Sequence, residues 1–264
     1  MRHNKKTNSK SGFTLVELAI VLVIIGLIIG GVLVGQDMIK SAEIRATIAQ
    51  YEKYNTAVNA FRDKFGGFPG DLRNATNFGF NARASATGGA TTGDGNGLVE
   101  DCATGSGGML LGCETAAYFE DLSIANMIED SATMGTDLDD TNHAGGVAVV
   151  DLLPEAKFGG GSVWQVYNTQ GRNWFHLGGV DISGAGPTVT DTISPIDAFN
   201  VDNKVDDGEA DSGVVIAVSA RGTSDTVVAG AAGDCKSAAA VYNTDEDNAG
   251  ESITPSCQLM LRMN

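Results

Sequence analysis

The first 65 residues are organised by a change in hydrophobic pattern. A polar leader, residues 1–12, precedes an apolar stretch over residues 13–34 whose one charged side chain is Glu17. As an α-helix these 22 residues would measure roughly 33 Å, enough to cross a bilayer core of about 30 Å. We therefore predict a membrane-spanning helix over residues 13–35. A carboxylate in such a helix is costly, so Glu17 is a candidate functional residue.

The apolar pattern becomes amphipathic after Gln36. Apolar side chains then recur at spacings of three or four residues: Ile44, Ile48, Tyr51, Tyr54, Val58, Phe61 and Phe65. No proline occurs before Pro69, and Gly66-Gly67 form a stop signal. The pattern predicts one helix over residues 14–65, with an amphipathic part at 36–65.

Residues 66–264 are predicted to form a globular head. Residues 116–130 have the pattern of a short amphipathic helix, and strand-like runs occur at 147–153, 163–167, 174–177 and 214–219. The predicted fold class is α+β, with the long N-terminal helix packed on a small antiparallel sheet that carries long loops.

Four glycines interrupt the apolar helix, at Gly26, Gly30, Gly31 and Gly35. They form two G-x-x-x-G pairs, a spacing that lets helices approach closely. Close packing is one interpretation, and local unwinding near Gly30-Gly31 during assembly is the other.

The leader predicts how the helix is oriented. It contains four basic residues and no acidic one, and such a flank stays cytoplasmic, so the head is expected on the other side of the membrane. A secretory signal would place a small-residue cleavage site after the apolar region, and no A-x-A sequence follows Val34.

Residues 12–17, GFTLVE, resemble the leader signature of type IV pilins and type II secretion pseudopilins. The resemblance implies a pilin-like fold, cleavage between Gly12 and Phe13 by prepilin peptidase, and N-methylation of Phe13. The leader 1–12 would be lost, and the new amino group of one subunit could pair with Glu17 of its neighbour. The alternative is an ordinary single-span anchor that tolerates Glu17 near the interface.

The resemblance also implies partners and a location. The partners are other pilin or pseudopilin subunits, prepilin peptidase and an inner-membrane assembly platform. The protein would reside in the bacterial inner membrane as a single-pass protein with a periplasmic head, and then in a pilus or pseudopilus.

The charge balance argues against nucleic acid as a direct partner of the head. Loss of the leader leaves 13 Lys and Arg residues against 33 Asp and Glu residues, a formal charge of −20. The sequence has no G-x-S-x-G, H-E-x-x-H or Walker motif, so we expect a structural protein rather than an enzyme.

The chain has four cysteines, at 102, 113, 235 and 257, none in C-x-x-C spacing. In an oxidising compartment the local pairings are Cys102–Cys113 and Cys235–Cys257, although four cysteines allow three connectivities. Each bridge would close a short loop and contribute about 3 kcal/mol.

No cofactor is required by this interpretation, but a structural calcium ion is predicted. The ligand candidates are Asp202, Asp206, Asp207 and Asp211, clustered around a glycine turn. The segment resembles the acidic loop of pseudopilin heads and is not an EF-hand. Residues 94–97, DGNG, are a second, weaker candidate, and both segments could also be solvated turns.

The remaining aromatic and histidine residues favour structural roles. We expect Trp164, Trp174 and Phe175 in the core of the head rather than in a binding patch. His143 and His176 are expected at the surface or as hydrogen-bonded core residues rather than as metal ligands.

The sequence thus predicts a prepilin-like structural subunit that polymerises through its N-terminal helix into a type IV pilus or a type II secretion pseudopilus. The alternative is a single-span membrane protein that does not polymerise and whose outer domain binds a ligand or calcium. The pattern does not separate a major pilin, a minor pilin and a pseudopilin, nor does it indicate the process served.

Overall fold

A computed structural model describes a long helix and several parts of the head. The described residues are 14–81, 93–100, 113–130, 153–169, 171–181, 188–218, 235–236, 241–242, 244 and 257–263. The chain divides into two compact units, Met1–Ala42 and Glu43–Asn264. Gly12, Phe13, Cys102 and His143, each named in a prediction above, lie outside the described residues.

Helix α1 runs from Leu15 to Phe65, as the periodicity predicts. It ends where Gly66 adopts a φ of 82° and its amide donates to the carbonyl oxygen of Arg62 at 2.8 Å. The predicted apolar face is confirmed within the second unit. Of the residues on this face, Ile44, Tyr51, Tyr54, Val58 and Phe61 are buried, and Ile48 and Phe65 are partly buried.

Three shorter helices follow α1 in the described part of the head. They are the 3₁₀ helix η1 (Ala75–Phe78), α2 (Cys113–Ile124) and α4 (Pro195–Val205). Helix α2 begins three residues before the predicted range 116–130 and ends at Ile124. Helix α4 was not predicted, and it places Asp202 in a helix instead of the expected turn.

Within the described residues of the head, five antiparallel strands form the sheet. They are β1 (Val163–Thr169), β2 (Arg172–Asp181), β3 (Thr188–Thr190), β4 (Val215–Val218) and β5 (Gln258–Arg262). The order is β1-β2-β5-β4, with β3 paired to β2, so a strand from the end of the sequence occupies the interior of the sheet.

The strand predictions are partly confirmed. The runs at 163–167, 174–177 and 214–219 correspond to β1, β2 and β4. Strands β3 and β5 were missed, and residues 147–152 of the remaining predicted run lie outside the described residues.

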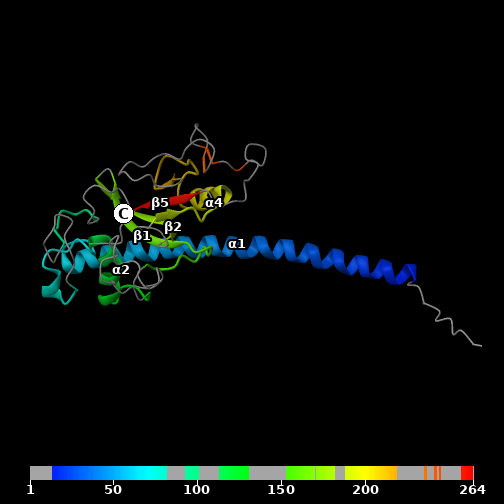
Figure 1. Cartoon of the computed structure of the whole chain (residues 1–264), viewed down its shortest axis with the longest axis horizontal. Coiled ribbons are helices and arrows are strands. Elements are labelled where there is room, and N and C mark those ends of the chain that lie inside the picture. The colour runs from blue at the N-terminus through cyan, green and yellow to red at the C-terminus, as the bar shows by residue number, and fades with distance from the viewer. Residues whose placement is uncertain are drawn as a thin grey trace, which may run out of the picture. The chain divides into compact units, whose positions relative to one another are not determined.

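The core of the head forms where α1 meets the sheet (Figure 1). The ring of Tyr54 packs edge-on against Trp164 of β1 at 5.9 Å and against Phe119 of α2 at 5.4 Å, measured between ring centroids. Tyr51 packs against Phe175 of β2 at 5.9 Å. Trp164 and Phe175 are fully buried, so the predicted core role of these two residues is confirmed.

The opposite face of the sheet carries a second, smaller apolar cluster. Trp174 packs there with Val218 and Met260, and all three are buried. His176 is also buried and shares a hydrogen bond of 2.8 Å with Gln258, which agrees with the prediction of a hydrogen-bonded core histidine.

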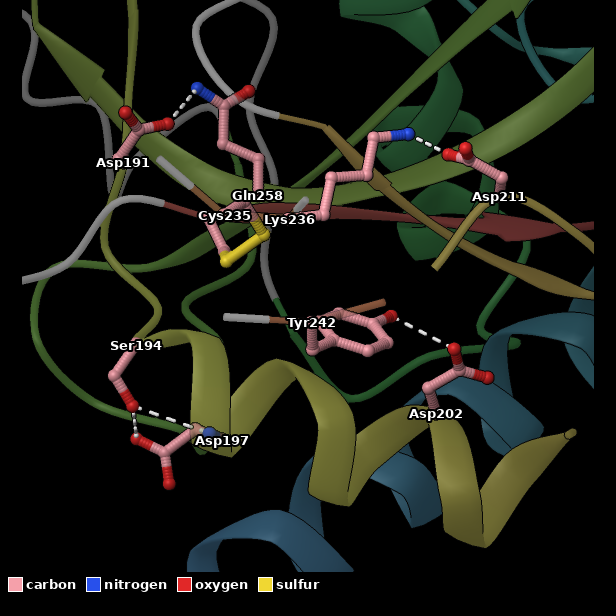
Figure 2. The surroundings of a disulfide bond; sticks show 10 residues. Asp191, Ser194, Asp197, Asp202, Asp211, Cys235, Lys236, Tyr242 and Gln258 are labelled. Atoms are coloured by element: carbon pink, nitrogen blue, oxygen red, sulfur yellow. Dashed lines mark hydrogen bonds and ion pairs between the residues drawn. A yellow bond between two sulfur atoms is a disulfide. The ribbon is translucent and has the colours of Figure 1, made fainter. Parts of the chain in front are cut away.

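A disulfide joins Cys235 to Cys257, the residue just before β5 (Figure 2). The amide of Cys257 donates to the carbonyl oxygen of Ile193 at 3.0 Å, which brings the start of α4 next to the same point. The disulfide thus links Cys235, which lies 22 residues earlier in the sequence, to the start of the interior strand β5.

Candidate functional site

Thr14 and Glu17 cap the N-terminus of α1 with their side chains. The carboxylate of Glu17 accepts hydrogen bonds from the backbone amide and the hydroxyl of Thr14, both at 2.8 Å. The Thr14 hydroxyl in turn accepts a hydrogen bond from the Glu17 amide at 3.2 Å. This reciprocal arrangement is a capping box, which supplies partners to amides that the helix itself leaves unpaired.

The apolar side chains that follow Glu17 are exposed within their own unit. Leu15 is 89% exposed and Leu27 is 73% exposed. Among the described helices, α1 is the one long and apolar enough to cross a membrane, by length and composition. Exposure of so many large apolar side chains requires lipid or other apolar helices around them.

The predicted calcium ligands are only partly brought together. Asp202, Asp206 and Asp207 each place a carboxylate oxygen within 4.8 Å of the others; we call these three residues the Asp202 group. Asp202 is buried at the end of α4 and accepts a hydrogen bond of 2.8 Å from the Tyr242 hydroxyl (Figure 2). Burial raises the pKa of Asp202 to about 6.

The fourth predicted ligand, Asp211, has a different partner. It forms an ion pair with the buried ammonium of Lys236, next to Cys235 (Figure 2). Asp211 is therefore outside the Asp202 group, and its negative charge is already neutralised.

A second group of carboxylates forms around the weaker predicted segment 94–97. Asp71, Asp94 and Glu114 lie within 4.8 Å of one another; we call them the Asp71 group. They come from the turn after α1, the loop 93–100 and the first turn of α2. Two of them are buried, Asp71 at 1% exposure and Glu114 at 2%.

The Asp71 group holds the loop 93–100 through backbone amides. Asp71 accepts from the amides of Gly95 and Gly97 at 2.6 and 2.7 Å. Glu114 accepts from the amides of Asp94 and Glu100 at 3.2 and 2.9 Å. Each carboxylate oxygen has a second lone pair, so these bonds leave capacity for a cation.

Burial changes the protonation of this group. The pKa of Glu114 is raised to about 8, mainly by burial and also by the negative charges of Asp71 and Asp94, against the opposing effect of the two amide hydrogen bonds. Burial also raises the pKa of Asp71, which the amides of Gly97 and Gly95 partly oppose. Positive charge near the three carboxylates would therefore stabilise the ionised forms.

Comparison with known protein families gives a match at the start of the chain. Residues 7–33 match the family model described as the prokaryotic N-terminal methylation motif. The chain carries a prepilin-type signal of the type IV pilin and pseudopilin kind. No curated protein and no solved structure matches the chain.

The prepilin-type signal covers the start of α1, including Glu17 and its capping partner Thr14. With the small antiparallel sheet that follows, the long helix gives the head a pilin-like α+β architecture. The signal and the apolar helix support a membrane-anchored, pilin-like protein whose signal is a substrate for prepilin peptidase.

Sequence reasoning missed two features around these sites. It did not connect Asp71 and Glu114 with residues 94–97, although the P-G-D turn at 69–71 and an acidic residue at a helix start were both visible. It also missed the Thr14–Glu17 capping box, whose T-x-x-E spacing is a known helix-start signal.

Proposed function

We propose that this protein is a structural prepilin-like subunit that is cleaved between Gly12 and Phe13, methylated on Phe13, and polymerised through α1 into a type IV pilus or type II secretion pseudopilus. The observation that carries the proposal is the prepilin-type signal at 7–33, placed on the first turns of an exposed apolar helix that contains Glu17. The polymer would give these apolar side chains partners outside the lipid. The motive force would come from other components of the assembly system.

Glu17 has a defined role in this proposal. Once the leader is removed, the amino group of Phe13 in one subunit pairs with the Glu17 carboxylate of its neighbour inside a bundle of apolar helices. Removing one member of a buried charge pair costs about 3–5 kcal/mol, because the other charge is left unpaired. Assembly should therefore depend strongly on this one side chain.

The experiment is Glu17→Ala in cells that assemble the protein. We expect the variant to reach the membrane but to be lost from sheared filaments by about a hundred-fold or more, the factor that corresponds to about 3 kcal/mol. Glu52→Ala, an exposed glutamate on the same helix, is the matched control and should assemble normally. If Glu17→Ala assembled as well as Glu52→Ala, a single-span protein that does not polymerise would be the better account.

We also propose that the head binds a structural calcium ion through its clustered carboxylates. The Asp202 group supplies three of the four predicted ligands, and the Asp71 group supplies three further carboxylates. Within the described residues no ion pair to a Lys or Arg involves the Asp71 group, whereas Lys236 neutralises Asp211, the fourth predicted ligand. Carboxylate oxygens from separate segments suit calcium, which accepts six to eight oxygen ligands in flexible geometry.

A further inference from the structure

A groove of about 650 Å³ opens in the head where α1 ends. It lies next to the Asp71 group, and neither the prepilin-type signal nor the calcium proposal accounts for it. Its walls come from the last turn of α1, the turn that follows, η1 and the loop 93–100. The side chains that matter for its chemistry are Arg62, Phe65, Phe68, Arg73 and Phe78.

Two exposed arginines give the groove a positive character. The guanidinium of Arg62 lies 4.4 Å from the ring centroid of Phe68. The Nε of Arg73 donates to the carbonyl oxygen of Asp94 at 3.0 Å. Both guanidinium groups are thereby oriented, and in the part of the chain that the structure describes neither forms an ion pair with a carboxylate.

Oriented guanidinium groups are suited to carboxylates. Each has five N–H donors and stays charged at all physiological pH values, so donors remain after the contacts just described. The one acidic residue in the lining, Asp71, is buried and accepts from two backbone amides. Its charge therefore does not occupy either arginine.

The floor of the groove offers apolar contact beside these charges. The ring of Phe78 is 52% exposed and packs edge-on against Phe65 at 5.7 Å between centroids. Arginine and aromatic side chains together are the composition enriched at protein-binding hot spots. A small anion alone would leave this aromatic surface uncovered, whereas a polypeptide segment would cover it.

We infer that this groove binds a carboxylate-bearing segment on the head of a second copy of this chain. Charge complementarity selects that partner, because the chain without its leader has a formal charge of −20 and the exposed acidic residues of its head include Glu155 and Glu209. Neighbouring heads of this charge repel one another in a polymer. A positive groove that accepts a neighbour's carboxylates offsets that repulsion and fixes the register between heads. The inference rests on the proposed polymerisation.

The test is charge reversal in the full-length protein, in cells that assemble it. Arg62→Glu with Arg73→Glu should lower the yield of sheared filaments about ten-fold or more, since a loss of about 1.4 kcal/mol changes an association constant ten-fold. Lys157→Glu with Arg172→Glu is the control, because it changes the net charge equally at exposed sites outside the groove. The control should assemble within about two-fold of wild type, and leader cleavage should be unchanged in both.

Each outcome decides the inference. If the Glu variant does not accumulate in the membrane, Arg62→Gln with Arg73→Gln, which removes both positive charges but keeps a polar side chain with N–H donors, takes its place with the same expectation. Normal filament yield from the groove variants alongside normal wild-type filaments would overturn the inference alone. Normal filaments that lose only a later activity would place a different acidic partner in the groove and would also overturn it. If wild type itself forms no filaments, the proposed function fails and the inference fails with it.

Discussion

At the scale of single residues, Glu17 has one role in the free subunit and another in the proposed polymer. In the subunit it closes a capping box with Thr14, which satisfies backbone amides at the start of α1. Those hydrogen bonds also lower the cost of carrying a carboxylate at the edge of a membrane before assembly. In the polymer the same carboxylate would form an ion pair with the methylated amino group of a neighbouring Phe13.

Glu114 carries the clearest prediction about pH. Its pKa is raised to about 8 in the folded protein, whereas an unfolded glutamate titrates near about 4.3. Between these values the folded protein binds more protons than the unfolded protein, so the free energy of unfolding falls as pH rises. With calcium chelated, we expect a lower melting temperature at about pH 8 than at about pH 5, and calcium should restore it at the higher pH.

The melting temperatures of variants of the full-length protein in detergent show which group of carboxylates causes the pH and calcium dependence. Glu114→Gln should flatten the pH dependence and remove the calcium effect if the Asp71 group holds the ion. Asp207→Asn should remove the calcium effect if the Asp202 group holds it, while Asp63→Asn, an exposed acid on α1, should change neither property. A melting temperature that responds to neither pH nor calcium would contradict both the site and its electrostatics.

At the scale of secondary-structure elements, the sequence was informative where a pattern was long. Helix α1 has 51 residues, so its apolar period could be followed through many turns and both its ends could be predicted. Strand β5 has only five residues, and its neighbours β2 and β4 are distant in sequence, so no local signal marked it as an interior strand. Helix α4 did have a signal, since Ser194 caps it, Pro195 begins it, and the Ser194 hydroxyl accepts from the Asp197 amide.

The turn after α1 depends on a glycine for a steric reason. Gly70 has a φ of 83°, and a Cβ there would overlap the carbonyl oxygen of Glu114. Gly79 has a similar φ of 87° but open space around it, which makes Gly79→Ala a matched control. The positive φ alone should cost about 1–2 kcal/mol in each variant.

Gly70→Ala should cost about 1–3 kcal/mol more than Gly79→Ala, because overlap with the α2 backbone adds to the strain. Chemical denaturation of the two variants measures the difference in the free energy of unfolding. Equal losses would show that the turn does not pack against α2 as tightly as the structure has it.

At the scale of the whole molecule, the two compact units correspond to two physical requirements. Residues of the first unit expose an apolar helix that needs lipid or other helices around it, while the second unit builds its own core from α1 and the sheet. The local signal around Glu17 could be predicted from consecutive residues. The Asp71 group and the groove beside it could not, because they combine segments that meet only after folding.

The most direct measurement of the central claim is the intact mass and N-terminal sequence of the protein recovered from filaments. The proposed function predicts a chain that begins at Phe13, lacks residues 1–12, and carries one added methyl group on the Phe13 nitrogen. A recovered chain that retains residues 1–12, with Phe13 unmethylated, would contradict it.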